Sequence, residues 1–288
     1  MLGKLLKYEF KSTSRVLWFL YAGLIAVSLI FGLVIRVNIN VDDIYITPTA
    51  IQSNDTLGLL MSILLSALGI IYVLLIYAIF ITTTVVIVMR FYKNMLGGEG
   101  YLMHTLPVKT SSLIVSKIIT SFCWMVIAAV VVVISTIVLG FSSGIIGYAL
   151  KYANWQEIVE GFKMVMSMFG VSGWTFILLL IVSSISSIIT YYTSMAIGNL
   201  ANNHKFLFSV LAYVGIGIVL SIILSITSVV GGMNIMDTAS SANYTDFTTQ
   251  MEAFMSYNVW TAIGTQIAVA VGGFFLTNYL LSKKLNLA

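Results

Sequence analysis

Six long apolar stretches constrain this sequence more than any other feature. A membrane-spanning helix needs about 20 consecutive apolar residues, and each stretch meets that length. Only helices or closed barrels satisfy the backbone in lipid, and these stretches lack the alternation of barrel strands. Apolar residues make up 59% of the chain and charged residues 8%, against roughly 25% charged in soluble domains, so we expect an all-α polytopic membrane protein. The predicted spans are residues 16–35, 58–89, 113–139, 171–198, 208–230 and 259–281 of a single domain covering 1–288.

The few charges segregate once these spans are assumed. The segments that would share one side hold eleven Lys and Arg and two acids, whereas the opposite segments hold three bases and eight acids. Cytoplasmic loops keep Lys and Arg, so the pattern predicts that both termini are cytoplasmic. The net charge of +4 comes from bases at membrane edges and not from a patch, so no nucleic-acid partner is expected. The basic segments are 1–15, 90–117, 199–207 and 282–288.

The first residues predict a helix that lies in the cytoplasmic interface and contacts membrane lipid. On a helical wheel the apolar residues share one face and three lysines share the other, which is typical of interfacial helices. Glu9 falls on the apolar face, and two interpretations stay open: a solvated place at the helix edge, or an ion pair with a base such as Arg90. The helix is predicted over residues 1–15, with Leu2, Leu5, Leu6, Glu9 and Phe10 on the apolar face.

Two outer segments are also predicted to be amphipathic helices. In residues 154–169, Asn154 and Glu157 have capping-box spacing ahead of an apolar face. In the outer loop predicted for 231–258, apolar residues recur at helical spacing after Thr245. Both segments either lie against the membrane or pack on the helix bundle, and the sequence leaves these alternatives open.

The sequence lacks the residues of several familiar active sites. No G-x-x-x-x-G-K-[ST] phosphate loop occurs, so ATP cannot bind this chain by that route. His104 and His204 lack the spacing of metal ligands, and Cys123 is the sole cysteine. Ionisable residues are absent from the predicted span interiors, which argues against a proton- or sodium-driven transporter. We therefore expect no cofactor, no metal ion and no catalytic residue in this chain.

Hydroxyl and small side chains are the polar features of the predicted spans. Hydroxyls bond across helices and small residues permit close approach, so helix packing is the preferred interpretation of both sets. A substrate path along them is the alternative. The fourth span carries a hydroxyl stripe at Ser183, Ser187, Thr190 and Ser194. The last span carries small residues at intervals of four, at Gly264, Ala268 and Gly272.

The loop between the second and third predicted spans carries the strongest local signal. It reads FYKNMLGGEGYLMHTLPVKTSS over residues 91–112. Gly97 and Gly98 end the preceding helix, and Pro107 ends a short helix predicted over about Glu99–Thr105. Tyr, Leu and Met together at an exposed tip predict a docking element for a partner.

The run RFYKN…GEGYLMHTLPV…SK, from Arg90 to Lys117, resembles the permease subunits of type-2 ABC exporters (the ABC-2 family) of Gram-positive bacteria. The start MLGKLLKYEFK and the six spans extend the resemblance over most of the chain. It implies a coupling loop at 96–109 whose helix docks in a cleft of a separate ATP-binding subunit, which holds ATP and Mg. The family has an acidic residue before Glu-Gly-Tyr, where this chain has Gly98. The implied docking residues are Glu99, Gly100, Tyr101, Leu102, Met103, His104, Thr105 and Leu106.

The resemblance also implies a permease dimer, homo- or hetero-, in a bacterial plasma membrane, with helices at about 245–257 gating the outer side. The expected function is ATP-driven outward movement of an apolar or amphipathic substrate, such as a peptide, a drug or a lipid. Such export would give multidrug or antimicrobial-peptide resistance, and this chain itself would not be an enzyme. Two alternatives stay open: a non-transporting sensor or immunity component, and a lipid-modifying membrane enzyme.

Overall fold

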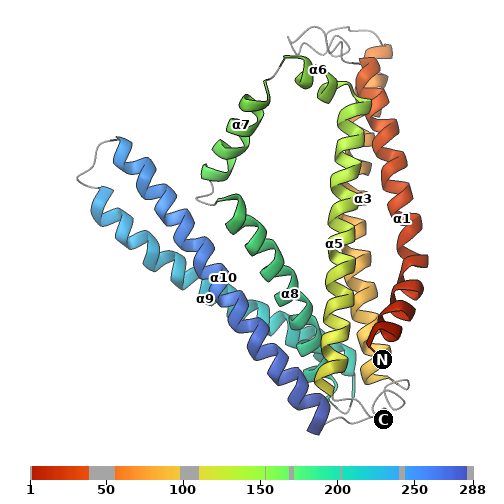
Figure 1. Ribbon diagram of the computed structural model, residues 1–288, viewed down its shortest axis with the longest axis vertical. Coiled ribbons are helices and arrows are strands. Elements are labelled where there is room, and N and C mark those ends of the chain that lie inside the picture. Colours follow the sequence, from red (N-terminus) through yellow and green to blue (C-terminus); the bar gives the residue numbers. More distant parts are fainter. Residues whose placement is uncertain are drawn as a thin grey trace. The chain divides into compact units, whose positions relative to one another are not determined.

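The computed structural model describes residues 2–38, 56–97, 110–152, 154–168, 172–201, 203–239 and 244–283. These residues are almost entirely helical, and no strand occurs among them (Figure 1). The elements in chain order are α1 (Leu2–Asn38), α3 (Thr56–Phe91), the π-helix η1 (Tyr92–Leu96), α5 (Thr110–Ser142), α6 (Ile145–Tyr152), α7 (Trp155–Met168), α8 (Gly173–Gly198), α9 (Lys205–Ala239) and α10 (Tyr244–Lys283).

Six of the described helices are long and apolar enough to cross a membrane. Each coincides with one of the six predicted spans, which confirms their number and their order in the chain. The protein is therefore an all-α, multi-pass membrane protein. The spans are Leu17–Val37, Leu59–Leu96, Thr110–Ser142, Gly173–Gly198, Lys205–Met233 and Thr249–Lys283.

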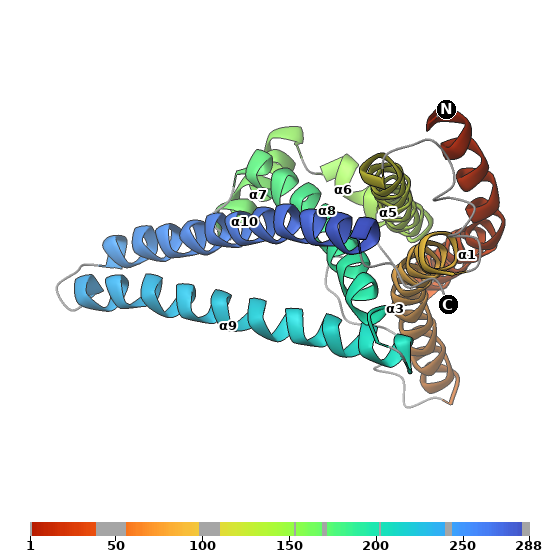
Figure 2. The same cartoon turned by 90° about the horizontal axis from the view of Figure 1, so that it is seen from below.

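The structure differs from the prediction at the helix ends. α1 starts at Leu2, so the predicted interfacial helix is continuous with the first span, although its first turns bend away from the later axis (Figure 2). α9 reaches Ala239 and α10 begins at Tyr244, so most of the predicted outer loop 231–258 is helix. Backbone hydrogen bonds persist beyond the lipid, so the end of an apolar run marks a membrane boundary and not a helix end. The amphipathic helix predicted over 154–169 corresponds to α7.

Contacts between residues group the described chain into two compact units. The first comprises Met1–Ile87 and Cys123–Trp155, and the second comprises Val88–Phe122 and Gln156–Ala288. α3 and α5 contribute to both units, so the two flanks of the predicted coupling loop belong to the second unit, together with α8, α9 and α10. A single domain over 1–288 stays a prediction.

The first unit has an apolar core between α1, α3 and α5. Tyr72 adds a polar contact, because its hydroxyl hydrogen-bonds to Ser135 Oγ at 3.1 Å and to Thr136 Oγ1 at 3.2 Å. Such bonds hold helices together in lipid, where burying apolar side chains gains little over a hydrocarbon solvent. The buried core residues are Leu17, Tyr21, Leu24, Tyr72, Ile79, Trp124 and Ala128.

In the second unit α8 packs against α9 and α10, and α9 lies beside α10 (Figure 1 and Figure 2). Two contacts join the C-terminal part of α9 to the N-terminal half of α10. Ser228 Oγ donates to Asn258 Oδ1, and the Tyr257 ring covers Gly231. A Cβ atom at Gly231 would lie 2.7 Å from that ring, so the close approach requires glycine. These contacts fix one end of the pair, and the site described next lies nearer its middle.

Candidate functional site

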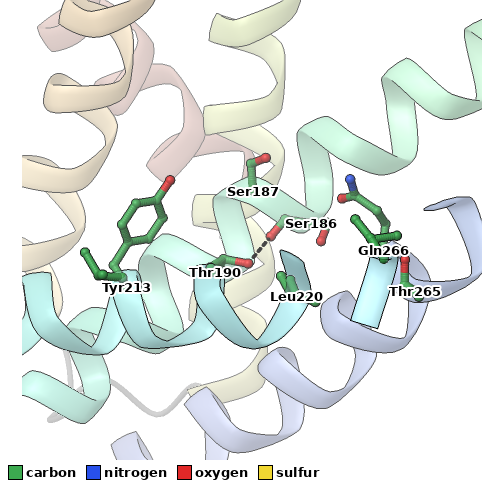
Figure 3. A pocket seen from close by; sticks show the side chains of 10 residues that line it. Ser186, Ser187, Thr190, Tyr213, Leu220, Thr265 and Gln266 are labelled. Atoms are coloured by element: carbon green, nitrogen blue, oxygen red, sulfur yellow. Dashed lines mark hydrogen bonds between the residues drawn. The ribbon is translucent and has the colours of Figure 1, made fainter. Parts of the chain in front are cut away.

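A cavity of about 230 Å³ lies between α8, α9 and α10 in the second unit (Figure 3). Three helices supply its wall, and its polar side chains come from all three. None of the described residues that line it is Asp, Glu, Lys, Arg or His. The lining residues are Ser186, Ser187, Thr190, Tyr213, Val214, Gly217, Leu220, Leu224, Thr265 and Gln266.

The cavity lies near the middle of the three spans that form it. Gln266 is 22 and 17 residues from the two ends of α10, and Ser186 and Ser187 occupy the central turns of α8. The hydrocarbon core of a bilayer is about 30 Å thick and offers no hydrogen-bond partners. The cavity therefore presents polar groups at a depth where lipid cannot satisfy them.

Hydroxyls along α8 differ in whether they are already hydrogen-bonded. Ser183 donates to Leu180 O at 3.1 Å, and Thr190 donates to Ser186 O at 2.8 Å. The hydroxyls of Ser186 and Ser187 form no hydrogen bond with any described residue. Two of the three α8 hydroxyls that line the cavity thus stay available as donors and acceptors.

On α10, too, one lining side chain is hydrogen-bonded within its helix and the next one is not. The Thr265 hydroxyl donates to Ala262 O at 3.0 Å, within its own helix. The Gln266 amide has no hydrogen-bond partner within the described part of the chain. An amide placed in apolar surroundings without a partner costs about 1–3 kcal/mol by mutational data. On the α9 side the Tyr213 ring stacks on Tyr191, with ring centroids 5.3 Å apart and planes tilted by 27°.

A second cluster of contacts lies in the same unit, next to the helix segments that precede and follow the predicted coupling loop. We call it the loop-flanking cluster: Phe91 at the end of α3, Ser121 about three turns into α5, and Tyr192 in α8. The rings of Phe91 and Tyr192 stack at 3.9 Å with planes 9° apart, and both side chains are buried. The Tyr192 hydroxyl hydrogen-bonds to Ser121 Oγ at 2.7 Å and donates to Lys117 O at 3.4 Å. One α8 residue therefore contacts both flanks of the loop.

The helix before the loop ends at the predicted glycine, but its last turn is a π-helix that the sequence did not predict. α3 passes into the π-helix Tyr92–Leu96, whose Met95 and Leu96 side chains are buried. Gly97 then has an extended backbone, and its N–H donates to Tyr92 O at 2.8 Å. Single π-turns are rare and occur frequently at functional sites. The prediction that Gly97 ends this helix is confirmed.

The contact between α8 and α10 involves a different small residue of α10 from those in the predicted stripe. Gly264 and Gly272 are exposed, and a Cβ atom at either position would meet nothing within 4 Å, so this stripe makes no close contact with another described helix of the chain, and its role in helix packing stays a prediction. Gly273 makes the close contact instead, since its Cβ would lie 2.8 Å from Ile189 and 2.9 Å from Thr193. Successive helical residues are about 100° apart, so Gly273 projects from another face than Gly272.

Bonds from Thr193 reinforce this contact. Its hydroxyl hydrogen-bonds to Thr277 Oγ1 of α10 at 3.0 Å, and its proton has two carbonyl acceptors, Ile189 O of α8 at 2.8 Å and Gly273 O of α10 at 3.1 Å. Thr193 follows Tyr192 directly, so adjacent residues of α8 bond to the loop flank and to α10.

The predicted hydroxyl stripe of α8 meets different surroundings along its length. Ser187 and Thr190 line the cavity, whereas Ser183 and Ser194 do not. Ser183 and Ser194 donate to carbonyls of their own helix, at Leu180 and Tyr191. The stripe therefore includes two of the cavity residues and two residues that lie outside it.

The remaining predicted site residues are not described. Residues 98–109 lie outside the described part of the chain, which includes the whole predicted coupling helix. The backbone of residues 2–13 is helical, but their side chains are not described, so the partners of Glu9 stay open. The docking residues affected are Glu99, Gly100, Tyr101, Leu102, Met103, His104, Thr105 and Leu106.

The sequence analysis missed several residues of the cavity and of the loop-flanking cluster. Gln266 had a usable signal, because an amide in the middle of an apolar span is costly there. Ser186 had a weaker one, as the neighbour of a stripe residue. Tyr213 and Tyr192 had none, because aromatic residues at helical spacing are also ordinary core residues.

Comparisons of this chain with known protein families, with curated proteins and with solved structures found no match. Among the described residues no group of three or more His, Cys, Asp or Glu is arranged to hold a metal ion. The cavity and the loop-flanking cluster are therefore the features on which a function can be argued.

Proposed function

We propose that this chain is the membrane-spanning permease subunit of an ATP-driven exporter of the type-2 ABC class. It pairs with a second permease copy or a related chain, and a separate ATP-binding subunit supplies the energy. The substrate is apolar or amphipathic and moves outward across a bacterial plasma membrane. The resemblance of residues 90–117 to the coupling region of such permeases motivates the proposal.

The observation that carries the proposal is the connection between the loop flanks and α8. Val88–Phe122, which includes both flanks, belongs to the same compact unit as α8, α9 and α10. The stack of Phe91 on Tyr192 and the bond of Tyr192 to Ser121 tie each flank to α8. A force applied to the loop would reach the spans that form the cavity. A subunit whose conformational change is driven by a separate ATP-binding subunit requires such a connection.

The charge distribution supports the orientation in this proposal. Six spans are an even number, so the two termini would lie on one side of the membrane. The segments on that side hold eleven of the fourteen Lys and Arg residues, which favours the cytoplasm. The loop at 98–109 would then face the cytoplasm, where ATP and a soluble ATP-binding subunit are found.

Recruitment of the ATP-binding subunit tests the proposal. The tagged chain is co-expressed with a candidate ATP-binding subunit, chosen as a neighbouring gene product that carries a phosphate loop, purified in lipid nanodiscs, and assayed for bound ATPase. We expect Glu99→Ala with Tyr101→Ala to reduce recruitment about tenfold, because a few central residues carry most of an interface's energy. The matched control is Trp155→Ala with Glu157→Ala, an acid and an aromatic residue that are both exposed on α7.

Four outcomes would contradict the proposal. Transport by the purified chain in liposomes without nucleotide would remove the need for a partner. Equal recruitment by the two double variants would remove the loop from the interface. Stable recruitment with no transport of any tested amphiphile would favour the sensor or immunity alternative, and turnover of a lipid by the purified chain would favour the enzyme.

A further inference from the structure

We propose that the cavity between α8, α9 and α10 binds the uncharged polar end of an amphipathic molecule, a hydroxyl or a carboxamide, while the apolar remainder of the molecule lies in lipid beside α9. That this molecule is the transported substrate rests on the proposed function. The binding of this molecule does not depend on the proposed function, because the cavity is formed by this chain alone.

The hydrogen-bonding groups of the cavity define the chemistry of the polar end. The Ser187 hydroxyl and the Gln266 amide line it, and neither has a hydrogen-bond partner among the described residues. A hydroxyl offers a donor and acceptor sites, and an amide offers two donors and an acceptor. The occupant that satisfies them must itself both donate and accept. A hydroxyl or a carboxamide does so, whereas an alkyl chain does neither.

The absence of charge at the cavity excludes an ionic group as the preferred occupant. No lining residue carries a charge. An ion at mid-membrane depth is strongly disfavoured unless it is paired. A neutral polar end is therefore favoured over a carboxylate, a phosphate or an ammonium group.

The size and position of the cavity indicate that only part of the ligand enters it. Its volume of about 230 Å³ is below the roughly 300–1,000 Å³ of pockets that enclose drug-sized ligands. The lining residues Tyr213 and Val214 on α9 are 43% and 48% exposed, so the wall is incomplete on that side. The remainder of the ligand can leave past α9 into the surrounding lipid.

Gly217 gives a way to close the cavity without disturbing its walls. It lines the cavity, and a Cβ atom built there meets nothing within 4 Å. Gly215 on the same helix also has open space around its Cβ position but does not line the cavity. Gly217→Leu should narrow the cavity, and Gly215→Leu is a control with the same change in helix propensity and apolar area.

Photolabelling of the full chain in nanodiscs tests binding. The probe is a diazirine-bearing analogue of dodecanamide, and the labelled peptides are located by mass spectrometry. The competitors are dodecanamide, dodecylammonium and dodecane. We expect labelling on the α8, α9 or α10 residues around the cavity, with dodecanamide the strongest competitor, dodecylammonium weaker and dodecane without effect.

Variants then connect the label to the named groups. Gly217→Leu should abolish labelling, and Gly215→Leu should leave it unchanged. Ser187→Ala with Gln266→Leu should weaken competition by dodecanamide about tenfold, the effect of losing one or two hydrogen bonds. Ser183→Ala is the control for this pair, because Ser183 lies outside the cavity and its hydroxyl is bonded to Leu180 O.

The possible results separate this proposal from its rivals. Equal competition by dodecane would identify a site for an acyl chain, and equal competition by dodecylammonium would identify a site for cations. Labelling elsewhere, or labelling that persists in Gly217→Leu, would also overturn the proposal. Loss of ATPase recruitment leaves these binding results intact, so the failure of the proposed function and the failure of this inference are distinguishable.

Discussion

The last turns of α8 and its middle use polar side chains in opposite ways. In the last turns Tyr192 and Thr193 are buried, and their hydroxyls bond to residues of neighbouring helices. In the middle, Ser186 and Ser187 carry hydroxyls with no partner among the described residues, beside a cavity. A polar group within a bilayer is costly unless it is bonded. The contacts of Tyr192 and Thr193, which we call the fixed joint, therefore hold the last turns of α8 to the neighbouring helices. The middle of α8 instead has polar groups that can bind a ligand.

The two regions are close enough to influence each other. Thr190 lines the cavity and Tyr192 is two residues later, which is about 3 Å along a helix axis. A rigid helix carries a displacement from one of these positions to the other. Within the proposed function, this makes α8 the element that both the loop and the ligand would bias.

The largest expected effect is at the fixed joint. Tyr192→Ala removes a fully buried ring that stacks on Phe91 and bonds to Ser121. Truncating a buried aromatic residue costs about 3–5 kcal/mol of unfolding free energy. Thermal unfolding in detergent should show this loss, while Tyr77→Ala, a tyrosine that is 62% exposed on α3, should leave stability nearly unchanged. Similar losses of unfolding free energy for Tyr192→Ala and Tyr77→Ala would mean that the contacts of Tyr192 stabilise the protein no more than those of an exposed tyrosine.

An intermediate effect is expected where α10 meets α8. Gly273→Val places methyl groups against Ile189 and Thr193, which are already 2.8 Å and 2.9 Å from an ideal Cβ. Overpacking of this kind costs about 1–3 kcal/mol. Gly272→Val has the same helix propensity change but meets open space, so the difference between the two variants isolates the contact. If Gly272→Val is the more destabilising variant in the same unfolding assay, the assigned helix face is wrong.

Much of the fold could be predicted because hydropathy and length alone select helices that cross a bilayer. The second predicted span begins at residue 58, and α3 begins at Thr56. Helix ends were less predictable: α10 begins at Tyr244, fifteen residues before the predicted residue 259. Polar residues such as Glu252 extend that helix, because a helix satisfies its own backbone with or without lipid.

The candidate site was only partly predictable because it depends on which helix faces meet. Helical spacing correctly puts Ser183, Ser187, Thr190 and Ser194 on one stripe, but it does not reveal that α8 changes neighbours along this stripe. The contact of Phe91 with Tyr192 joins residues far apart in the sequence, and no periodic pattern encodes it. The small residues of α10 illustrate the same limit, since spacing indicated Gly272 and the contact is made by Gly273.

The smallest expected effect compares two serines directly. Ser121→Ala removes the 2.7 Å bond to Tyr192, and among the described residues that buried hydroxyl then keeps only Lys117 O, at 3.4 Å. Losing one such bond costs about 1 kcal/mol. Ser187→Ala removes a hydroxyl that has no partner among the described residues, so we expect no loss of stability from it.

Stability and ligand binding should therefore separate between these two serines. Ser121→Ala should lower the unfolding temperature in detergent and leave photolabelling of the cavity unchanged, because Ser121 does not line it. Ser187→Ala should do the reverse, weakening competition by dodecanamide without a change in unfolding. Equal destabilisation by the two variants would mean that Ser187 is bonded in the folded protein. The contrast between a closed joint and an open middle of α8 would then no longer hold.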